Sequence, residues 1–153
     1  MTQSSRLKDI LDESIVLLKT SRTLFRHSME ACTAIGIKND YSTGELDQFE
    51  ALTARFARIS DICTQKVMRT LFQLLREDCP TFLDRAATAE KIGMIKSADD
   101  LVVIRDLRNT IAHEYVLEAL NDVFRTVLEY SPVLDGIIDA ITLYAESKKN
   151  LPG

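Results

Sequence analysis

The chain has 153 residues, of which 46% are hydrophobic and 27% charged, and this length suits about one domain with a real core. Its formal net charge of −4 argues against a wholesale nucleic-acid binder, which is normally basic, but leaves room for a local basic groove. No run approaches the roughly 18 apolar residues of a membrane span, and the polar start MTQSSRLKDI is unlike a signal peptide. We expect a cytoplasmic protein with one domain over residues 1–150 and a tail at 151–153.

Apolar residues at helical spacing predict a long first helix from about Ser5 to Ala34, which Gly36 ends. A polar loop, GIKNDYSTG, separates it from a second long helix. This second helix is expected to run from about Glu45 to Asp78 and to stop before Pro80. Two helices of about thirty residues joined by a short loop favour an antiparallel bundle.

Two shorter helices are predicted next, each with a recognisable start. Thr81 followed three residues later by Asp84 resembles a capping box for a short helix through about Met94. Ser97 is expected to cap a fourth helix, with two aspartates in its first turn that complement the helix dipole.

The C-terminal part predicts a fifth helix over about Leu117 to Tyr130. The pair Ser131-Pro132 permits a break or a kink before a last helix to about Lys148. No convincing strand is visible. The expected fold class is therefore all-α, an antiparallel helical bundle of four to five main helices plus a short one.

The fourth helix carries the stretch RDLRNTIAHEY, which is unusually polar for a helix with a core face. At about 100° per residue, Arg105 and Tyr115 fall within roughly 60° of Arg108, whereas Asn109 and His113 share an adjoining face. The core face is assigned to the intervening aliphatic residues. The polar residues are thus expected to point away from the core.

These residue types can cleave RNA without a metal ion. An imidazole with a pKa near ~6.5 can act as acid or base near neutrality, and a guanidinium can hold a phosphate and stabilise its transition state. We expect His113 to transfer protons, Arg108 to bind phosphate and Asn109 to support them. The sequence shows no array of carboxylates and histidines typical of Mg²⁺ or Zn²⁺, and no cofactor motif. On spacing alone, an exposed helix face with ion pairs remains an open alternative.

The segment RNTIAHEY also resembles the R-x-x-x-x-H-x-Y motif of HEPN-domain proteins, specifically the HepT-like toxins. In this resemblance Arg108 is the motif arginine, Asn109 the polar residue after it, His113 the histidine and Tyr115 the tyrosine. The order of long and short helices agrees as well, so that the likeness extends from about Tyr41 to Tyr144.

The resemblance implies a ribonuclease toxin of a toxin–antitoxin system that acts as a homodimer. It also implies a partner, an MntA-like nucleotidyltransferase antitoxin, which transfers AMP to Tyr115. A homodimer is expected on geometry too, because Arg108 and His113 are roughly 140° apart on one helix. The alternatives are a non-catalytic HEPN adaptor that serves a nucleotidyltransferase and, less favoured, a helical scaffold without any nucleic-acid role.

Basic residues recur on one side of the second helix, within a sector of roughly 80°. Such a one-sided row suits an RNA backbone, although a solvated face or a surface for the partner protein are competing interpretations. Glu50 and Asp61 are expected to project to the opposite side. The residues of this row are Arg55, Arg58, Lys66, Arg69 and Arg76. The first four of these, together with Arg105, are the expected RNA-binding residues.

Residues outside these motifs give weaker signals. His27 has no motif around it and is expected at the surface or packed beside a helix. Tyr41, in the first loop, could line a cleft or act as a staple. The widely spaced Cys32, Cys63 and Cys79 form no C-x-x-C pair, so buried free thiols are expected rather than a zinc site.

Overall fold

The structure is a computed structural model that describes residues 2–114 and 117–148. All regular structure in these two ranges is helical, which confirms the predicted all-α class. The helices are α1 (Gln3–Ile35), α2 (Thr43–Asp61), η1 (Ile62–Met68), α3 (Arg69–Leu74), α4 (Phe82–Lys91), α5 (Ala98–His113) and α6 (Leu117–Lys148).

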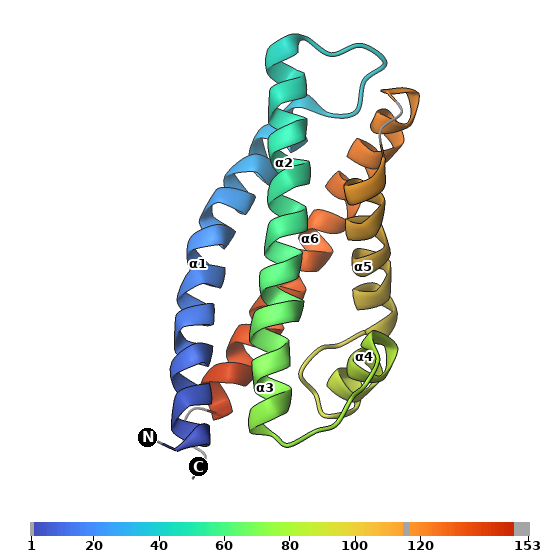
Figure 1. Cartoon of the computed structure of the whole chain (residues 1–153). Helices are drawn as coiled ribbons and strands as arrows, with labels where there is room; N and C mark the ends of the chain where they lie inside the picture. The colour runs from blue at the N-terminus through green and yellow to red at the C-terminus, as the bar shows by residue number, and fades with distance from the viewer. Residues whose placement is uncertain (1, 115–116, 149–153) are drawn as a thin grey trace.

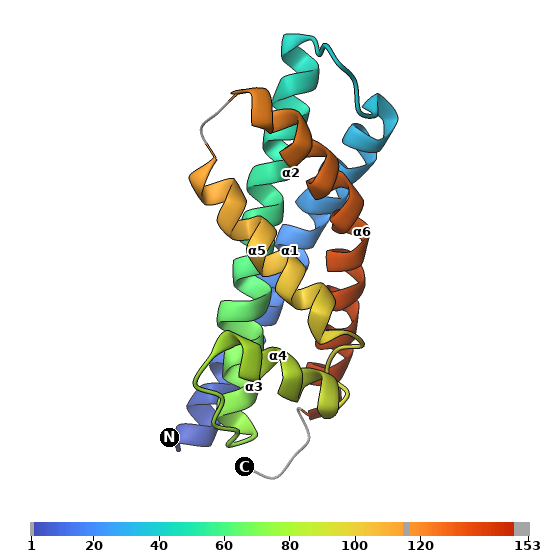
Figure 2. The same cartoon turned by 90° about the vertical axis from the view of Figure 1, so that its right-hand side faces the viewer.

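The long helices lie side by side as an elongated bundle (Figure 1). α1 runs antiparallel to the continuous rod formed by α2, η1 and α3, and α6 returns behind them. α5 crosses the outer side of this rod, and the short α4 lies below it (Figure 2). Aromatic rings fill the centre: Phe25 contacts Phe56 with ring centroids 6.2 Å apart, and Phe49 stacks on Phe124 at 5.0 Å. Burying each such ring stabilises the fold by about 1.5–3 kcal/mol.

The end of the first helix and the starts of α4 and α5 are confirmed, whereas α4 ends at Lys91 rather than at Met94. α1 ends at Gly36, whose φ of 74° is a left-handed conformation that glycine adopts without strain. The hydroxyl of Thr81 accepts a hydrogen bond from the amide of Asp84, and Ser97 caps α5 in the same way. A full capping box, which the sequence reading missed, begins α2: Ser42 and Glu45 each accept a hydrogen bond from the other's backbone amide.

The second helix contains a π-helical segment that sequence patterning did not indicate. Residues 62–68 form η1 between α2 and α3, without interrupting the rod. Cys63, Val67 and Met68 of this segment are fully buried, so core packing holds the wider turns in place. π-helical turns are rare and frequently occur at functional sites, because the extra residue redirects the side chains around it.

The second helix ends earlier than predicted, at Leu74 rather than at Asp78. Arg76 then adopts a φ of 56°, and the amide of Glu77 donates to the carbonyl of Phe72 at 3.0 Å, which closes the helix end. No glycine announces this end in the sequence. A side chain in the left-handed region costs about 1 kcal/mol.

Of the break or kink that Ser131-Pro132 permits, the break is wrong, since the two predicted helices are one helix, α6, which continues through Pro132 to Lys148. A proline lacks an amide hydrogen and normally disturbs the preceding turn. Here the buried hydroxyl of Ser131 donates to the carbonyl of Val127 at 2.6 Å, and buried residues on both sides of the proline keep the helix packed on the core. Tertiary packing therefore outweighs the local signal.

Tyr41 is a staple between the first loop and α6. Its hydroxyl donates to Oδ1 of Asn121 at 2.8 Å and accepts from the amide of Lys38 at 2.9 Å. Its ring packs on that of Phe49, with centroids 5.3 Å apart. Both functions of the phenol, polar and apolar, are thus used within the fold.

The three cysteines are free. Cys32 and Cys63 are buried as expected, and burial raises the pKa of the Cys32 thiol to about 11 and that of Cys63 to about 12. Both thiols are therefore protonated near neutral pH. Cys79 is only half-buried, and its thiol donates to the Thr88 hydroxyl at 3.5 Å.

Charged residues join α1 to α6. Asp135 accepts hydrogen bonds from Nε of Arg22 at 2.8 Å and from Nη2 of Arg26 at 3.0 Å, and Arg22 also contacts Asp139 at 2.7 Å. The Arg22 and Asp135 side chains are only 14% and 20% exposed.

Among the described helices, none is both long and apolar enough to cross a membrane.

Candidate functional site

An open groove lies where α5 crosses the rod at the junction of α2 and η1. Its volume is about 520 Å³. The groove carries four basic side chains and one carboxylate, and the rest of its lining is mainly polar. The lining residues are Arg58, Ser60, Asp61, Ile62, Thr64, Gln65, Lys66, Arg105, Arg108 and Asn109.

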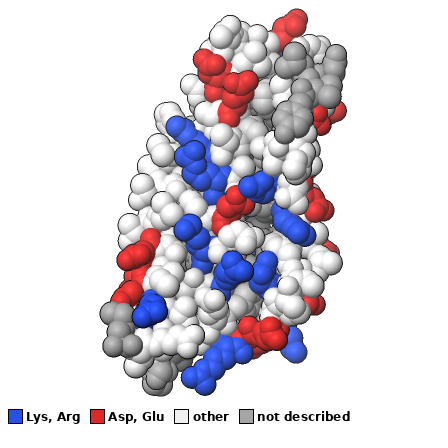
Figure 3. Space-filling view, viewed as in Figure 1, with Lys and Arg blue, Asp and Glu red and all other residues white. Residues whose placement is uncertain are grey.

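Basic side chains gather on this face of the molecule. Figure 3 shows them over the α2–η1–α3 rod and over α5, around a small acidic patch, whereas other acidic side chains lie at both ends of the molecule and along its edges. Basic side chains therefore gather around the groove although the chain as a whole is acidic. A groove of this kind attracts phosphate groups and raises their local concentration.

Arg108 is fixed in the groove by Asp61. Its Nε and Nη2 atoms donate to the two carboxylate oxygens of Asp61, each at 2.8 Å. This two-pronged pairing sets the plane of the guanidinium. The hydrogen bond to Asp61 further raises the pKa of Arg108, outweighing the partial burial that acts to lower it.

The expectation that Asp61 projects away from the basic row is wrong. Asp61 lines the same groove as Arg58 and Lys66. The reason is helix geometry, since residues three apart differ by only about 60° around an α-helix. Asp61 is also the last residue of α2, directly before the π-helical turns begin.

The side chain of Arg105 is held in place by Phe82 of α4. Its guanidinium carbon lies 4.8 Å from the centre of the Phe82 ring at the start of α4, while its side chain lines the groove beside Arg108. A cation above an aromatic face is attracted to it and keeps its hydrogen-bond donors available at the ring's edge. α4 therefore helps to orient a groove cation.

His113 does not line the groove in the single chain. It is exposed in the last turn of α5, about 7.5 Å along the helix axis from Arg108 and roughly 140° around it. The structure brings Arg105, Arg108 and Asn109 together but leaves His113 beyond one end of the groove. Tyr115 lies outside the described residues.

The predicted basic row is not one continuous surface. Arg58 and Lys66 line the groove and Arg69 is exposed further along the rod. Arg55 instead turns toward α1, where Nη1 donates to the hydroxyl of Ser28 at 2.7 Å and to the carbonyl of Leu24. Arg76 lies beyond the end of α3. These two arginines therefore do not share the groove: α1 engages Arg55, and the helix ends before Arg76.

Several groove residues were missed by the sequence reading. Asp61, Thr64 and Gln65 come from the rod, and Phe82 supports Arg105 from α4. The only sequence signal for Asp61 is that it follows Arg58 by three residues, a spacing that puts the two side chains on neighbouring sides of the helix. His27, the second histidine, is exposed on α1, which agrees with the expected surface position rather than with packing beside a helix.

Among the described residues, no group of three His, Cys, Asp or Glu side chains is arranged to hold a metal ion. Comparisons of the chain with protein-family models, with curated proteins and with solved structures find no match.

Proposed function

We propose that this protein is a metal-independent endoribonuclease, the toxin of a toxin–antitoxin pair. The observation that carries the proposal is the groove at the η1–α5 crossing. Four cations surround one carboxylate there, and that carboxylate holds Arg108 in a fixed plane. The arginine, asparagine and histidine of the R-x-x-x-x-H-x-Y motif lie in the groove or within two turns of it.

The proposed reaction uses the RNA's own 2′-hydroxyl. His113 removes its proton, the 2′-oxygen attacks the adjacent phosphorus, and the bond from phosphorus to the 5′-oxygen breaks. The leaving 5′-oxygen takes up a proton from the solvent and His113 returns its proton to the solvent, so the products are a 2′,3′-cyclic phosphate and a 5′-hydroxyl. Arg108 stabilises the negative charge on the phosphate as the new bond forms, and Asn109 supports it by hydrogen bonding.

A homodimer completes this site in the proposal. His113 lies off the Arg108 groove within one chain, but two antiparallel α5 helices around a twofold axis would bring His113 of one copy toward the groove of the other. Light scattering should then give twice the chain mass of 17.3 kDa for the active species. Activity confined to a monomer contradicts this arrangement.

The RNA backbone is proposed to follow Arg58, Lys66 and Arg105 along the groove, with Arg69 beyond it. Arg55 belonged to this set on sequence grounds, but it is engaged by α1 and is left out. The partner is proposed to be an MntA-like nucleotidyltransferase that silences the toxin by placing AMP on Tyr115. Mass spectrometry of the co-expressed pair should show one adenylate on that tyrosine. The absence of the adenylate contradicts the proposed AMP transfer.

The direct test is cleavage of a labelled RNA by purified protein in excess EDTA. We expect cleavage products that end in a 2′,3′-cyclic phosphate, at an unchanged rate when the chelator is added. Cleavage that stops on chelation contradicts the mechanism. Binding of RNA without any cleavage supports the non-catalytic adaptor instead, and the absence of both cleavage and binding leaves the scaffold.

Asp61→Asn should separate the positioning of Arg108 from the attraction of RNA phosphates to the groove. The amide keeps one acceptor for Arg108 but loses the charge and the second acceptor, so we expect the cleavage rate to fall about tenfold. Binding of an uncleavable 2′-deoxy oligonucleotide should tighten slightly, because the groove loses its carboxylate. Single-turnover kinetics and fluorescence anisotropy measure the two quantities. Asp47→Asn, an exposed site on α2, is the control of equal charge change; a loss of both rate and affinity contradicts the positioning role.

A further inference from the structure

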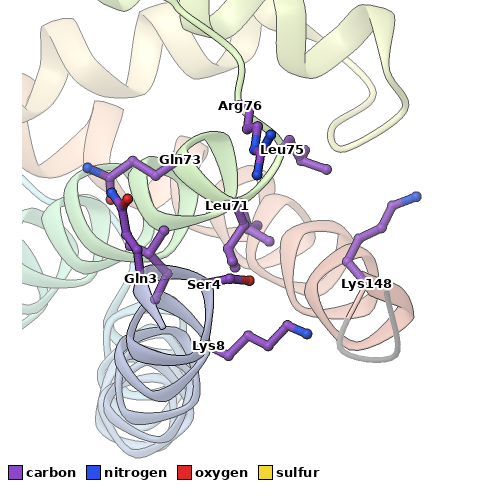
Figure 4. A pocket seen from close by; sticks show the side chains of 10 residues that line it. Gln3, Ser4, Lys8, Leu71, Gln73, Leu75, Arg76 and Lys148 are labelled. Carbon is purple, nitrogen blue, oxygen red and sulfur yellow. The ribbon is translucent and has the colours of Figure 1, made fainter. Parts of the chain in front are cut away.

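A second hollow lies at the opposite end of the bundle from the first loop, where α1 begins and α3 and α6 end (Figure 4). It has a volume of about 310 Å³, at the lower end of the range for small-molecule sites, which is about 300–1,000 Å³. The residues that line it are Gln3, Ser4, Leu7, Lys8, Leu71, Gln73, Leu74, Leu75, Arg76 and Lys148.

The lining divides into an apolar floor and a basic rim. Four leucines, at positions 7, 71, 74 and 75, form the floor, and Leu71 is almost fully buried. Lys8, Arg76 and Lys148 line the hollow from three separate parts of the chain, and Lys148 extends away from Arg76 and Leu71 in Figure 4. Among the described residues, those that line the hollow include no aspartate or glutamate. The hollow thus offers apolar contact from the leucines on one side and the Arg76 cation on the other.

Arg76 is the residue that singles out this hollow. It closes α3 with a φ of 56°, in the left-handed region where glycine is favoured. Within the described part of the chain its guanidinium makes no hydrogen bond or ion pair, so no contact there explains why a long cationic side chain occupies a strained position. Residues held in such conformations cluster at ligand sites. The strain is consistent with a side chain retained for a ligand.

We propose that this hollow binds a small anionic amphiphile, a free molecule with a carboxylate or phosphate head on an acyl chain of medium length. The head pairs with Arg76, and the chain lies on the leucine floor. Lys148 borders the hollow, and its Nζ lies 5.2 Å from the centre of the Tyr144 ring. The hollow is separate from the groove at the η1–α5 crossing, and the proposal does not depend on RNA cleavage.

The probe for this site is sodium decanoate, titrated calorimetrically into the full chain below its micelle concentration. We expect one decanoate per chain, together with amide shifts at Leu7 and Leu71 in heteronuclear spectra. Acetate carries only the head and decanol only the chain, so each should bind at least tenfold more weakly. Decyl phosphate tests whether the site distinguishes the two kinds of head. Equal binding of acetate or of decanol to decanoate overturns the proposal.

Arg76→Gly is a variant that removes the cation without endangering the fold, because glycine adopts a φ of 56° without strain. Its unfolding midpoint should equal or exceed that of the parent, while decanoate binding weakens tenfold or more. Arg76→Lys restores a cation at the same place and should bind within about threefold of the parent. Lys96→Gln, an exposed lysine away from the hollow, is the matched charge control.

Three further outcomes overturn the inference. Full decanoate affinity in Arg76→Gly shows that the strained cation is not used. A loss of affinity in Lys96→Gln as large as in Arg76→Gly shows attraction by net charge alone. Recruitment to vesicles of anionic lipid without any binding of monomeric decanoate assigns the basic rim to a membrane surface rather than to a free amphiphile.

Discussion

Replacing His113 by alanine should lower the rate of RNA cleavage by at least about 100-fold, since a positioned acid or base contributes typically 10²–10⁴-fold. The fold should be unaffected, because His113 is exposed in the last turn of α5 and lies off the core. Single-turnover cleavage of a labelled RNA measures the rate, and circular dichroism during thermal unfolding measures the fold. His27→Ala is a matched control, because the chain's other histidine is exposed on α1.

The placement of His113 off the Arg108 groove makes a further check possible. If one catalytic centre takes residues from two copies, His113→Ala and Arg108→Ala should each be inactive alone. After they are unfolded together and refolded as a mixture, part of the activity should return. Cleavage that survives in His113→Ala, or that is lost equally in His27→Ala, contradicts a role for this imidazole in proton transfer.

The fold could be predicted where the signal is local. Gly36, Thr81 and Ser97 mark helix ends because their backbone freedom or side-chain oxygens act within one turn, and each lies where expected. The π-helical turns of η1, the end of α3 at Leu74 and the passage of α6 through Pro132 depend on packing between distant segments. A periodic pattern read along one helix carries no information about such packing.

In the candidate site, too, the residues that are near one another in sequence were predictable and those brought together by packing were not. Arg105 and Arg108 are three residues apart on α5, so their common face was readable from the spacing. The spacing grouped Asn109 with His113, whereas the structure places Asn109 in the groove with the two arginines. Asp61 is 47 residues away from Arg108 in sequence, and Phe82 belongs to a separate helix. Only the crossing of α5 over the rod brings them to the same groove. The redirection of Arg55 toward Ser28 likewise depends on the adjacent α1.

Asp135→Asn should destabilise the fold by about 2–3 kcal/mol at pH 7, an effect large for a single polar residue. Asp135 accepts charged hydrogen bonds from both Arg22 and Arg26, and the Arg22 side chain is only 14% exposed. The amide cannot balance the positive charge of Arg22, which stays largely buried between α1 and α6 with the more exposed Asp139 as its remaining acidic partner. Asp139→Asn is the control: that side chain is 63% exposed and its loss should cost at most about 1 kcal/mol.

The pH dependence of stability provides a second readout for Asp135. Burial acts to raise the pKa of this carboxyl, but hydrogen bonds from Arg22 and Arg26 outweigh burial and lower it. The folded protein therefore releases this proton more readily than the unfolded chain does. The stabilisation is complete above the ordinary aspartate pKa of about 3.9 and is lost as the pH falls below it. Urea unfolding between pH 7 and pH 3 should show the difference between parent and Asp135→Asn narrowing in acid; a constant difference means that the carboxylate's charge is not what joins α1 to α6.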